Sequence, residues 1–145
     1  MKIAKTRNVK TPNRGTPQSA GLDFFVPEDF EQVDLPPGNS VFIPSGVKAN
    51  VPQGHALIAF NKSGVALKKN LSIGACVVDE DYQGEIHLHL YNFGTSSVSI
   101  SPGEKLVQMV LVPVLYENVD VVDEPTLFDN ETTRGSGGFG STGNF

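Results

Sequence analysis

The stretch Gly74–Ile86, GACVVDEDYQGEI, decides how the rest of the chain is interpreted. An apolar run leads directly into three acids, Asp79, Glu80 and Asp81, and a strand-like alternation follows. Carboxylates next to an apolar strand lose hydration unless a cation, hydrogen-bond donors or a catalytic task compensates for it. The stretch is therefore a candidate site, and a solvated acidic turn is the alternative.

Composition around this stretch predicts one all-β domain. The chain has 145 residues, of which 39% are hydrophobic and 19% charged, enough for one core. The 15 glycines and 10 prolines favour many turns between short strands. No segment has the pattern of a long helix.

Charge and cysteine content exclude several function classes. A net charge of -5 disfavours nucleic acid as a partner, because phosphate neutralisation needs clustered Lys and Arg, although a phosphorylated small substrate remains possible. The single cysteine, Cys76, suits a reducing compartment. The N-terminal residues do not resemble a signal peptide, and no apolar run is long enough to span a bilayer. We expect a soluble, cytoplasmic protein without a membrane partner.

Two segments upstream of the acidic stretch carry candidate site residues. In Ala20–Phe25, AGLDFF, Gly21 permits close backbone approach, and Asp23 either orients a water or hydrated metal or forms an ordinary turn. The strand-like run 54–60 leads into Lys62, Ser63 and Gly64. At a strand end these residues supply a cation, a hydroxyl and a backbone N–H for phosphate, or they form an exposed turn.

The segments around Val33–Val51 and downstream of the acids predict further strands. Residues 33–51 have the Pro-Gly and Ser-Gly turns of a sandwich, jelly roll or barrel. In 86–91, His87 and His89 share one face, and a polar or subunit-contacting face is favoured over metal ligation. Residues 98–115 predict a hairpin in which Gln108 is either a core amide or a site residue.

The C-terminal part differs in composition. Residues 116–133 predict an extended connector, and Arg134–Gly143 is RGSGGFGSTG. Its glycine spacing matches a dinucleotide fingerprint formally and approaches a P-loop, but no helix can follow and the P-loop lysine is missing. A flexible arm able to cover a phosphate chain and cap a ring remains, and a disordered tail is the alternative. The aromatic Phe139 favours the arm.

Taken together, five segments resemble the ordered motifs of the homotrimeric dUTP diphosphatases (dUTPases). These segments are AGLDFF, NKSGVA, VVDEDYQGEI, PGEKLVQMV and RGSGGFGSTG, from about Ala20 to Gly143. The resemblance implies a jelly-roll/β-clip domain (1–128) and an arm (129–145) that closes over an active site of the trimer. It also implies that one chain supplies motifs one, two and four of each site, a second chain motif three, and a third chain the arm.

The function implied by the resemblance is hydrolysis of dUTP to dUMP and pyrophosphate, which limits uracil incorporation into DNA and supplies dUMP for thymidylate synthesis. Asp79 would activate the water that attacks the α-phosphorus, with Asp23 near that water and the hydrated metal. Mg²⁺ would be held by phosphates and waters, without direct protein ligands. The residues that would contact the phosphates are Lys62, Ser63, Gly64, Gln108, Arg134, Ser141 and Thr142.

The same resemblance assigns residues to the nucleoside. Phe139 would close over the uracil, and the arm glycines Gly137, Gly138 and Gly140 would let the backbone approach the nucleotide. Tyr82 would pack on the deoxyribose and exclude a 2′-hydroxyl, so that UTP is rejected. Backbone groups around Ala75 and Cys76 would read the uracil edge.

Two departures and three alternatives accompany this interpretation. Lys62 stands where the family usually has Arg, and Cys76 where a small residue is common. A dCTP deaminase of the same superfamily needs a glutamate base and Arg-Ser-Ser in the second motif, whereas this chain has Asn61–Gly64, NKSG. A nucleotide-gated regulatory protein with an unknown partner is the second alternative. A calcium loop is excluded because Leu90 occupies the place of the bidentate glutamate.

Overall fold

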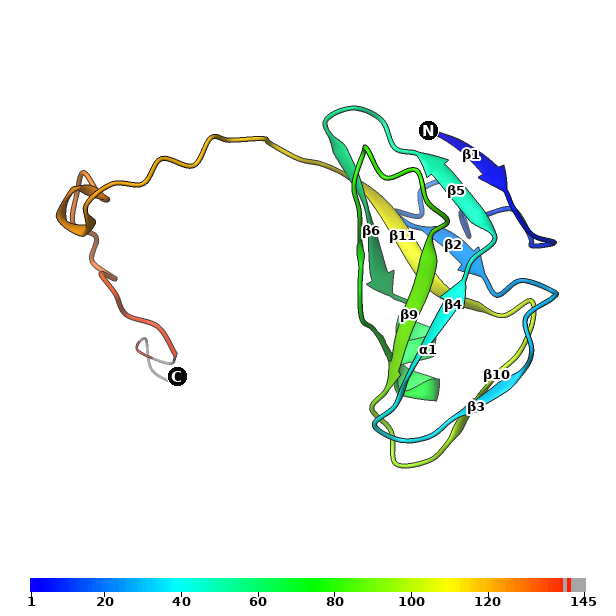
Figure 1. Cartoon of the computed structure of the whole chain (residues 1–145). Helices are drawn as coiled ribbons and strands as arrows, with labels where there is room; N and C mark the ends of the chain where they lie inside the picture. Colours follow the sequence, from blue (N-terminus) through cyan, green and yellow to red (C-terminus); the bar gives the residue numbers. More distant parts are fainter. Residues whose placement is uncertain (140, 142–145) are drawn as a thin grey trace. The chain divides into compact units, whose positions relative to one another are not determined.

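Strands dominate the structure, a computed structural model that describes residues 1–139 and 141. The all-β prediction is confirmed, with one short α-helix and one 3-10 helix in this part of the chain (Figure 1). The strands are β1 (Lys2–Lys5), β2 (Leu22–Phe25), β3 (Val33–Leu35), β4 (Ser40–Pro44), β5 (Val47–Asn50), β6 (His55–Asn61), β7 (Leu71–Ile73), β8 (Val77–Val78), β9 (His87–Asn92), β10 (Val98–Ile100) and β11 (Lys105–Pro113). The helices are α1 (Ser63–Lys69) and η1 (Glu124–Thr126).

The chain divides by its contacts into two units, Met1–Leu115 and the segment from Tyr116 onward. All eleven strands of the described residues belong to the first unit, and η1 belongs to the second. No helix in the described ranges is long and apolar enough to cross a membrane. The functional boundary between residues 128 and 129 stays a prediction.

Antiparallel pairing organises the first unit into four sheets. The largest has the order β2-β11-β6-β8, and a second has the order β4-β9-β7. β1 pairs with β5, and β3 pairs with β10. The longest ladder joins β11 to β6, from Val107 opposite Asn61 to Pro113 opposite His55. Figure 1 shows β6 beside β11 and β4 beside β9.

The core follows from strand alternation. In β9, Leu88 and Leu90 are buried while His87 and His89 are half-buried on the other face, as the sequence predicts. Met109 of β11 is also buried. The remaining large, fully buried side chains come from several strands and the loops between them: Phe24, Val26, Ile43, Val47, Leu57, Leu71, Ile86, Ile100 and Leu106.

The predicted hairpin over residues 98–115 is wrong in its pairing. A turn does form at Pro102-Gly103, where Gly103 has φ +77°, but β10 pairs with β3 and β11 pairs with β2 and β6. The Gly103 N–H donates to the carbonyl of Val26 (2.9 Å), and the Val26 N–H donates to the carbonyl of Glu104 (2.8 Å). These bonds hold the turn beside the segment that follows β2. At this turn the chain leaves the sheet of β3 and β10 and enters the sheet of β2, β11, β6 and β8.

The segment after β6 also departs from the expected strand-end loop. It forms α1, which begins at Ser63, ends at Lys69 and is capped by Asn70, a left-handed residue with φ 52°. The Asn70 N–H closes the helix on the carbonyl of Ala66 (3.1 Å), and asparagine tolerates this conformation well. Lys62 therefore precedes a helical turn, with Ser63 and Gly64 inside it.

Candidate active site

A hollow of about 160 Å³ lies beside the acidic turn. Asp79 and Tyr82 line it together with Ala75 and Cys76 from the turn before β8. The wall also includes residues of β4, β6, β9 and β11: Phe42, Ala59, His87 and Met109. We call it the Asp79 pocket. It combines one carboxylate, one phenol and a backbone turn.

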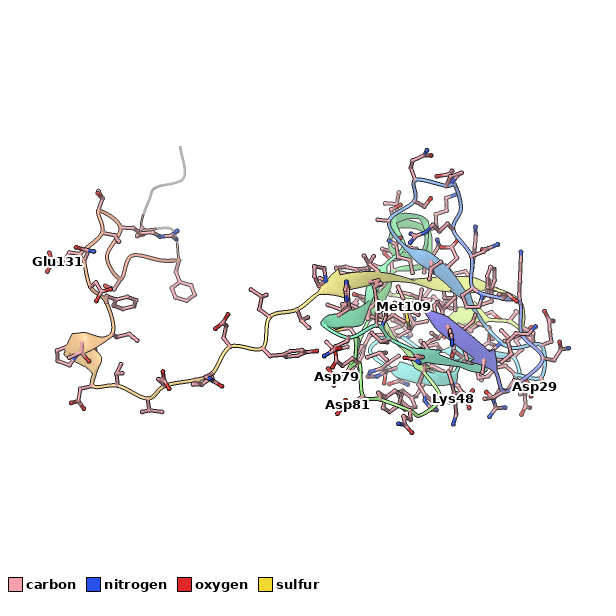
Figure 2. All side chains as sticks on the ribbon, turned by 90° about the horizontal axis from the view of Figure 1, so that it is seen from above. Asp29, Lys48, Asp79, Asp81, Met109 and Glu131 are labelled. Atoms are coloured by element: carbon pink, nitrogen blue, oxygen red, sulfur yellow. The ribbon has the colours of Figure 1, made fainter. Side chains whose placement is uncertain are left out.

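Asp79 stands at the end of β8, whose pairing with β6 fixes the start of the acidic turn. Its side chain is exposed, and its carbonyl accepts the N–H of Tyr82 (3.3 Å). Asp79 and Asp81 come from the same turn (Figure 2). The Glu80 carboxylate accepts the N–H of Gly54, so Glu80 ties the turn to the loop before β6. An accessible carboxylate on an anchored turn can accept a proton from a nearby water.

The orientation of Tyr82 depends on a glycine that the sequence analysis did not assign to the site. The phenol donates to the carbonyl of Glu85 (2.9 Å), and the ring lies against the backbone of Gly84. A Cβ at Gly84 would lie 2.3 Å from the phenol oxygen, which is impossible without moving the ring. The Tyr-x-Gly spacing is the sequence signal for this arrangement.

The turn Gly74–Cys76 is hydrogen-bonded on both sides. The Gly74 N–H donates to the carbonyl of His89 (2.8 Å), and the Ala75 N–H donates to Nδ1 of the same histidine (2.9 Å). The carbonyl of Cys76 accepts the Ala59 N–H (2.8 Å). Within the described residues, the carbonyl of Ala75 and the N–H of Cys76 have no such bond. These two groups, together with the carbonyl of Gly74, are therefore available to a ligand.

Asp23, in β2, forms a buried ion-pair cluster. Its side chain is 7% exposed, Lys62 Nζ bonds to Oδ1, and Lys105 Nζ lies 3.2 Å from Oδ2. Burial alone raises the pKa of Asp23, but the hydrogen bonds and charges of Lys62 and Lys105 outweigh it, so the pKa lies below its ordinary value. Lys105 was not among the predicted site residues. Its signal was a cation at the start of the PGEKLVQMV strand.

Gln108 belongs with this cluster rather than with the hydrophobic core. It lies opposite Asp23 on one side and Phe60 on the other. Its Nε2 donates to the carbonyl of Asn61 (2.7 Å). A Cβ at Gly21 would lie 2.7 Å from Gln108 Oε1, which confirms that Gly21 permits a close approach. The half-exposed amide is thus held by the backbone at the end of β6.

The sheet separates the two groups of site residues. Directly paired residues share a face, so Asp23, Gln108 and Phe60 form one row across β2, β11 and β6. The next pair along β11 and β6, Met109 with Ala59, points to the opposite face and lines the Asp79 pocket. One chain therefore presents the Asp23 cluster and the Asp79 pocket on opposite faces of the same sheet.

Lys62, Ser63 and Gly64 lie next to the Asp23 cluster. Lys62 contacts Asp23, while Ser63 and Gly64 are exposed in the first turn of α1. A Cβ at Gly64 would meet no atom within 4 Å. The helical turn thus leaves open space beside a lysine.

His87 and Phe42 are pocket residues that the sequence analysis missed. Their rings stack with centroids 4.4 Å apart and an interplanar angle of 8°. The signal was the His-x-His alternation, which was interpreted as a polar or subunit-contacting face. In the described part of the chain, no three His, Cys, Asp or Glu side chains gather as a metal site.

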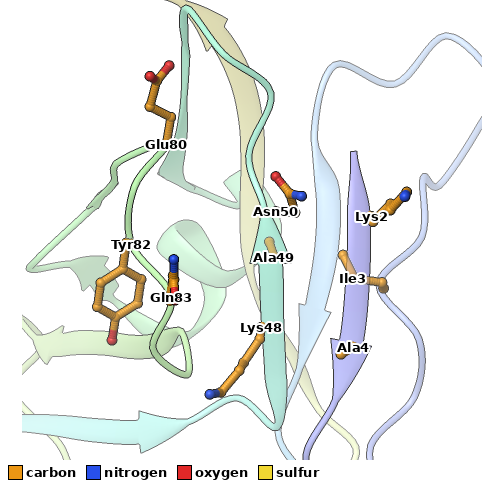
Figure 3. A pocket seen from close by; sticks show the side chains of 9 residues that line it. All are labelled: Lys2, Ile3, Ala4, Lys48, Ala49, Asn50, Glu80, Tyr82 and Gln83. Atoms are coloured by element: carbon orange, nitrogen blue, oxygen red, sulfur yellow. The ribbon is translucent and has the colours of Figure 1, made fainter.

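A larger hollow, of about 400 Å³, adjoins Tyr82 (Figure 3). It is lined by residues of β1 and β5, including Lys2 and Lys48, and by Glu80 and Gln83. Neither Asp23 nor Asp79 contributes to it. Size alone does not identify the site, because the chemical groups meet in the smaller Asp79 pocket.

The predicted arm residues lie in the second unit. Arg134 Nε donates to the carbonyl of Gly137 (2.9 Å), and the Ser141 N–H donates to the carbonyl of Gly138 (3.0 Å). Phe139 is fully exposed, with φ 48°. Two further predicted residues, Gly140 and Thr142, lie outside the described residues.

Comparison with known proteins gives concordant matches. The dUTPase family model matches residues 7–143. The deoxyuridine 5′-triphosphate nucleotidohydrolase of Chlamydia pneumoniae is 40% identical over 91% of this chain and 90% of that protein. The Gloeothece citriformis protein of the same name is 38% identical over 99% and 97%.

Solved structures show the same fold. A mutant dUTPase of Staphylococcus bacteriophage 80alpha with dUpNHpp has a TM-score of 0.86 and 25% identity, covering 98% of this chain and 97% of that one. A mutant dUTPase from phage phi11 of S. aureus has a TM-score of 0.77 and 23% identity, covering 89% and 98%. In that phi11 dUTPase a structural Mg(II) ion is coordinated.

Proposed function

This chain belongs to the dUTPase family, and on that premise we propose that it hydrolyses dUTP to dUMP and pyrophosphate. The observation that carries the proposal is the Asp79 pocket, where a carboxylate adjoins Tyr82 and the Gly74–Cys76 turn. In a cell this reaction limits uracil incorporation into DNA and supplies dUMP for thymidylate synthesis. The single half-buried Cys76 suits the reducing cytoplasm, where we place the protein.

Asp79 acts as the general base. A water oxygen bonds to the α-phosphorus, the bond from that phosphorus to the oxygen bridging to the β-phosphate breaks, and pyrophosphate leaves. The proton of the water passes to the Asp79 carboxylate. Attack on the α-phosphorus needs an in-line water and neutralisation of the charge on the phosphate oxygens and the leaving pyrophosphate, so positioning and charge neutralisation matter more than covalent help. The exposure of Asp79 supports this role, because a water can reach it.

The Asp23 cluster supplies the phosphate side. Lys62 and Lys105 provide positive charge, and Gln108 lies in the same row. Both lysines bond to Asp23 in the free chain, so the carboxylate holds their ammonium groups in place until phosphate oxygens share them. Ser63 and Gly64 add a hydroxyl and a backbone N–H in the open first turn of α1.

Mg²⁺ would be held by the phosphate oxygens of the substrate and by water, with Asp23 near its waters. It is a hard cation that prefers phosphate oxygens and water, and it dehydrates reluctantly. The ion would add positive charge to the phosphate chain. Asp23 remains ionised, because Lys62 and Lys105 lower its pKa. It can accept hydrogen bonds from waters around the ion without being a direct metal ligand.

The working enzyme is a homotrimer whose sites combine several chains. Supporting this, the Asp23 cluster and the Asp79 pocket lie on opposite faces of one sheet, so two copies are needed to bring them to one ligand. The arm of a third copy closes over the nucleotide, with Arg134 at the phosphates and Phe139 over the uracil. Their exposure leaves both side chains accessible.

Base and sugar selection belong to the Asp79 pocket. The carbonyl of Ala75 and the N–H of Cys76 pair with the uracil edge. The Tyr82 ring, held by its bond to Glu85, lies against the deoxyribose and excludes a 2′-hydroxyl. Phe42 and His87 extend the wall on the far side of the pocket.

One assay tests the proposal directly. Pyrophosphate and ammonia release are measured with Mg²⁺ for dUTP, dTTP, dCTP and UTP in parallel. We expect pyrophosphate from dUTP alone and no ammonia. Ammonia from dCTP would show the deaminase reaction instead, and equal pyrophosphate release from all four nucleotides would refute specificity for dUTP.

A further inference from the structure

The Gly74–Cys76 turn is held by a single residue of the neighbouring strand. His89, in β9, receives the Gly74 N–H on its backbone carbonyl (2.8 Å) and the Ala75 N–H on its ring Nδ1 (2.9 Å). The turn joins β7 to β8, which belong to different sheets, so no ladder runs through it. The bond from the Ala59 N–H to the Cys76 carbonyl holds the far end of the turn, and the two bonds to His89 hold its start beside the Asp79 pocket.

The close contact of the His89 ring requires a glycine at position 74. A Cβ at Gly74 would lie 2.2 Å from Nδ1 and 2.6 Å from Cε1 of His89. No L side chain fits there without displacing the imidazole. The glycine and the histidine thus form one unit, in which the ring occupies the space that a side chain would fill.

Two aromatic rings hold the imidazole from its other sides. Phe42 of β4 meets it edge-on, with centroids 5.8 Å apart and an angle of 78°, and Tyr91 lies 4.8 Å away. Tyr91 is the titratable side chain in contact with the His89 ring. The second titratable neighbour, His87, stacks on Phe42, which in turn contacts the His89 ring. No ion pair to His89 occurs among the described residues.

The hydrogen bond fixes the protonation of the ring. Nδ1 can accept the Ala75 N–H only through its lone pair, so the proton of the neutral imidazole is on Nε2. Protonation of Nδ1 would place one N–H donor against another. The contact would then be lost while the Gly74 bond to the His89 carbonyl remained.

We propose that His89 is a positioning residue for base recognition, whose neutral ring holds the Gly74–Cys76 turn in its ligand-binding shape and releases it on protonation. The inference rests on the proposed function for its effect on dUTP. His89 itself does not touch the substrate. It holds the N–H of the Gly74–Ala75 peptide, and this peptide precedes the one that carries the Ala75 carbonyl and the Cys76 N–H, so the bond positions both groups through the backbone of Ala75.

Amide hydrogen exchange tests the contact without any catalysis. In ¹⁵N-labelled full-length protein, the protection factor of the Ala75 amide is measured at about pH 7.5 and about pH 5. We expect roughly fivefold less protection at the lower pH, as for one lost hydrogen bond. The Gly74 amide is the internal control and should keep its protection. Equal protection of Ala75 at both pH values would overturn the proposal.

Two variants separate the ring contact from general packing. His89→Asn keeps an acceptor near the position of Nδ1 but cannot titrate, whereas His89→Leu fills the space without an acceptor. His55→Leu is the matched control. His55 begins β6, its ring nitrogen bonds to the carbonyl of Gln53, and it does not line the Asp79 pocket.

Steady-state kinetics then gives the functional result. His89→Leu should raise the KM for dUTP roughly fivefold with kcat within about twofold, and His89→Asn should stay near wild type at both pH values. Wild-type KM should rise at the lower pH. A His89→Leu enzyme with unchanged KM would remove the effect on binding. If the wild type does not hydrolyse dUTP, the proposed function fails, whereas the exchange experiment still decides the role of His89.

Discussion

Two aspartates of this chain occupy opposite environments, and their environments suit different tasks. Asp79 is exposed on a turn, where water reaches it, while Asp23 is buried between two lysines. A base must accept a proton during the reaction, but a carboxylate that organises cations must stay ionised. Placement alone therefore divides the roles of two chemically identical groups.

The first residue-scale prediction concerns Asp79. In Asp79→Asn, kcat for dUTP should fall by about 10²–10⁴-fold, because the amide cannot take the proton from water. Binding of dUpNHpp, measured by calorimetry, should remain. Asp81→Asn is the matched control, since Asp81 lies in the same turn but outside the Asp79 pocket. Wild-type turnover in Asp79→Asn would refute the mechanism.

A second prediction concerns Asp23 and pH. Its pKa is lowered in the folded chain, so the unfolded chain binds the proton more readily. The stability that Asp23 contributes is present above its ordinary pKa in the unfolded chain, about 3.9, and is lost as pH falls through the lower folded pKa.

Urea unfolding from neutral pH to about pH 3 measures this dependence. Asp23→Asn should cost about 1–2 kcal/mol at neutral pH, because Lys62 and Lys105 lose a charged hydrogen-bond partner but remain accessible to water, and the difference from wild type should shrink in acid. The exposed Asp34, in β3, supplies the control variant Asp34→Asn. A constant difference at every pH would contradict the role of the ion pairs.

At the scale of elements, glycines decide how the turns of the site are shaped. Gly21, Gly74 and Gly84 each face a side chain at a distance that no Cβ could tolerate: Gln108, His89 and Tyr82, respectively. None of the three has a positive φ, so the requirement is space and not backbone conformation. Each glycine lets a strand or turn accept a ring or amide directly on its backbone.

Gly84→Ala tests this at the acidic turn. The added methyl group should push the Tyr82 ring away from its bond to Glu85 and weaken the exclusion of the 2′-hydroxyl. We expect the ratio of kcat/KM for dUTP over UTP to fall by about 10-fold, while the protein stays folded. Gly15→Ala is the control, since a Cβ there meets only Ser19 at an ordinary 3.6 Å. An unchanged ratio would show that Gly84 does not position Tyr82.

At the scale of the whole molecule, the sheet that builds the core also separates the two halves of the site. The Asp23–Gln108–Phe60 row and the Asp79 pocket lie on its two faces. A symmetric oligomer solves this problem, because each copy can offer one half to each of two neighbours. If the proposed trimer forms in this way, catalysis requires assembly of the chains.

Subunit mixing tests the shared site. Asp79→Asn and Gln108→Ala are each expected to be poorly active, and they damage opposite halves. After random exchange, about a quarter of the sites should combine an intact Asp79 with an intact Gln108 from different chains, and activity should recover accordingly. Mixing Asp79→Asn with Tyr82→Ala should restore nothing, because both changes damage the same half. Absence of recovery after verified exchange would show that one chain builds its own site.

Removal of the arm is the second whole-molecule prediction. Deleting residues from Arg134 onward should leave the unit Met1–Leu115 folded, with an unchanged thermal transition, because that unit has its own core. Turnover of dUTP should fall steeply, since the arm supplies a cation and an aromatic cap. Full activity in the truncated enzyme would refute the role of the arm, and loss of the thermal transition would show that the arm builds the fold.

The sequence by itself determined the class of the fold and most of the chemical groups of the site. Alternation placed Leu88 and Leu90 in the core and the half-buried histidines of the same strand on its other face. The acids, the lysine before Ser63 and the glycine-rich tail stood in a recognisable order. These features are local, because side-chain periodicity and turn chemistry act over a few residues.

Only the tertiary structure decided which of these groups meet. It joined Lys105 to Asp23 across 82 positions, placed β10 beside β3 instead of β11, and set the ring of His89 against Gly74. Such contacts depend on how sheets pair and pack over long stretches of chain, and the residue pattern of one strand does not specify its partner. The separation of Asp79 from the Asp23 cluster has the same origin. The two groups lie on opposite faces of the sheet β2-β11-β6-β8, in which β2 comes from the beginning of the sequence and β11 from the end of the first unit.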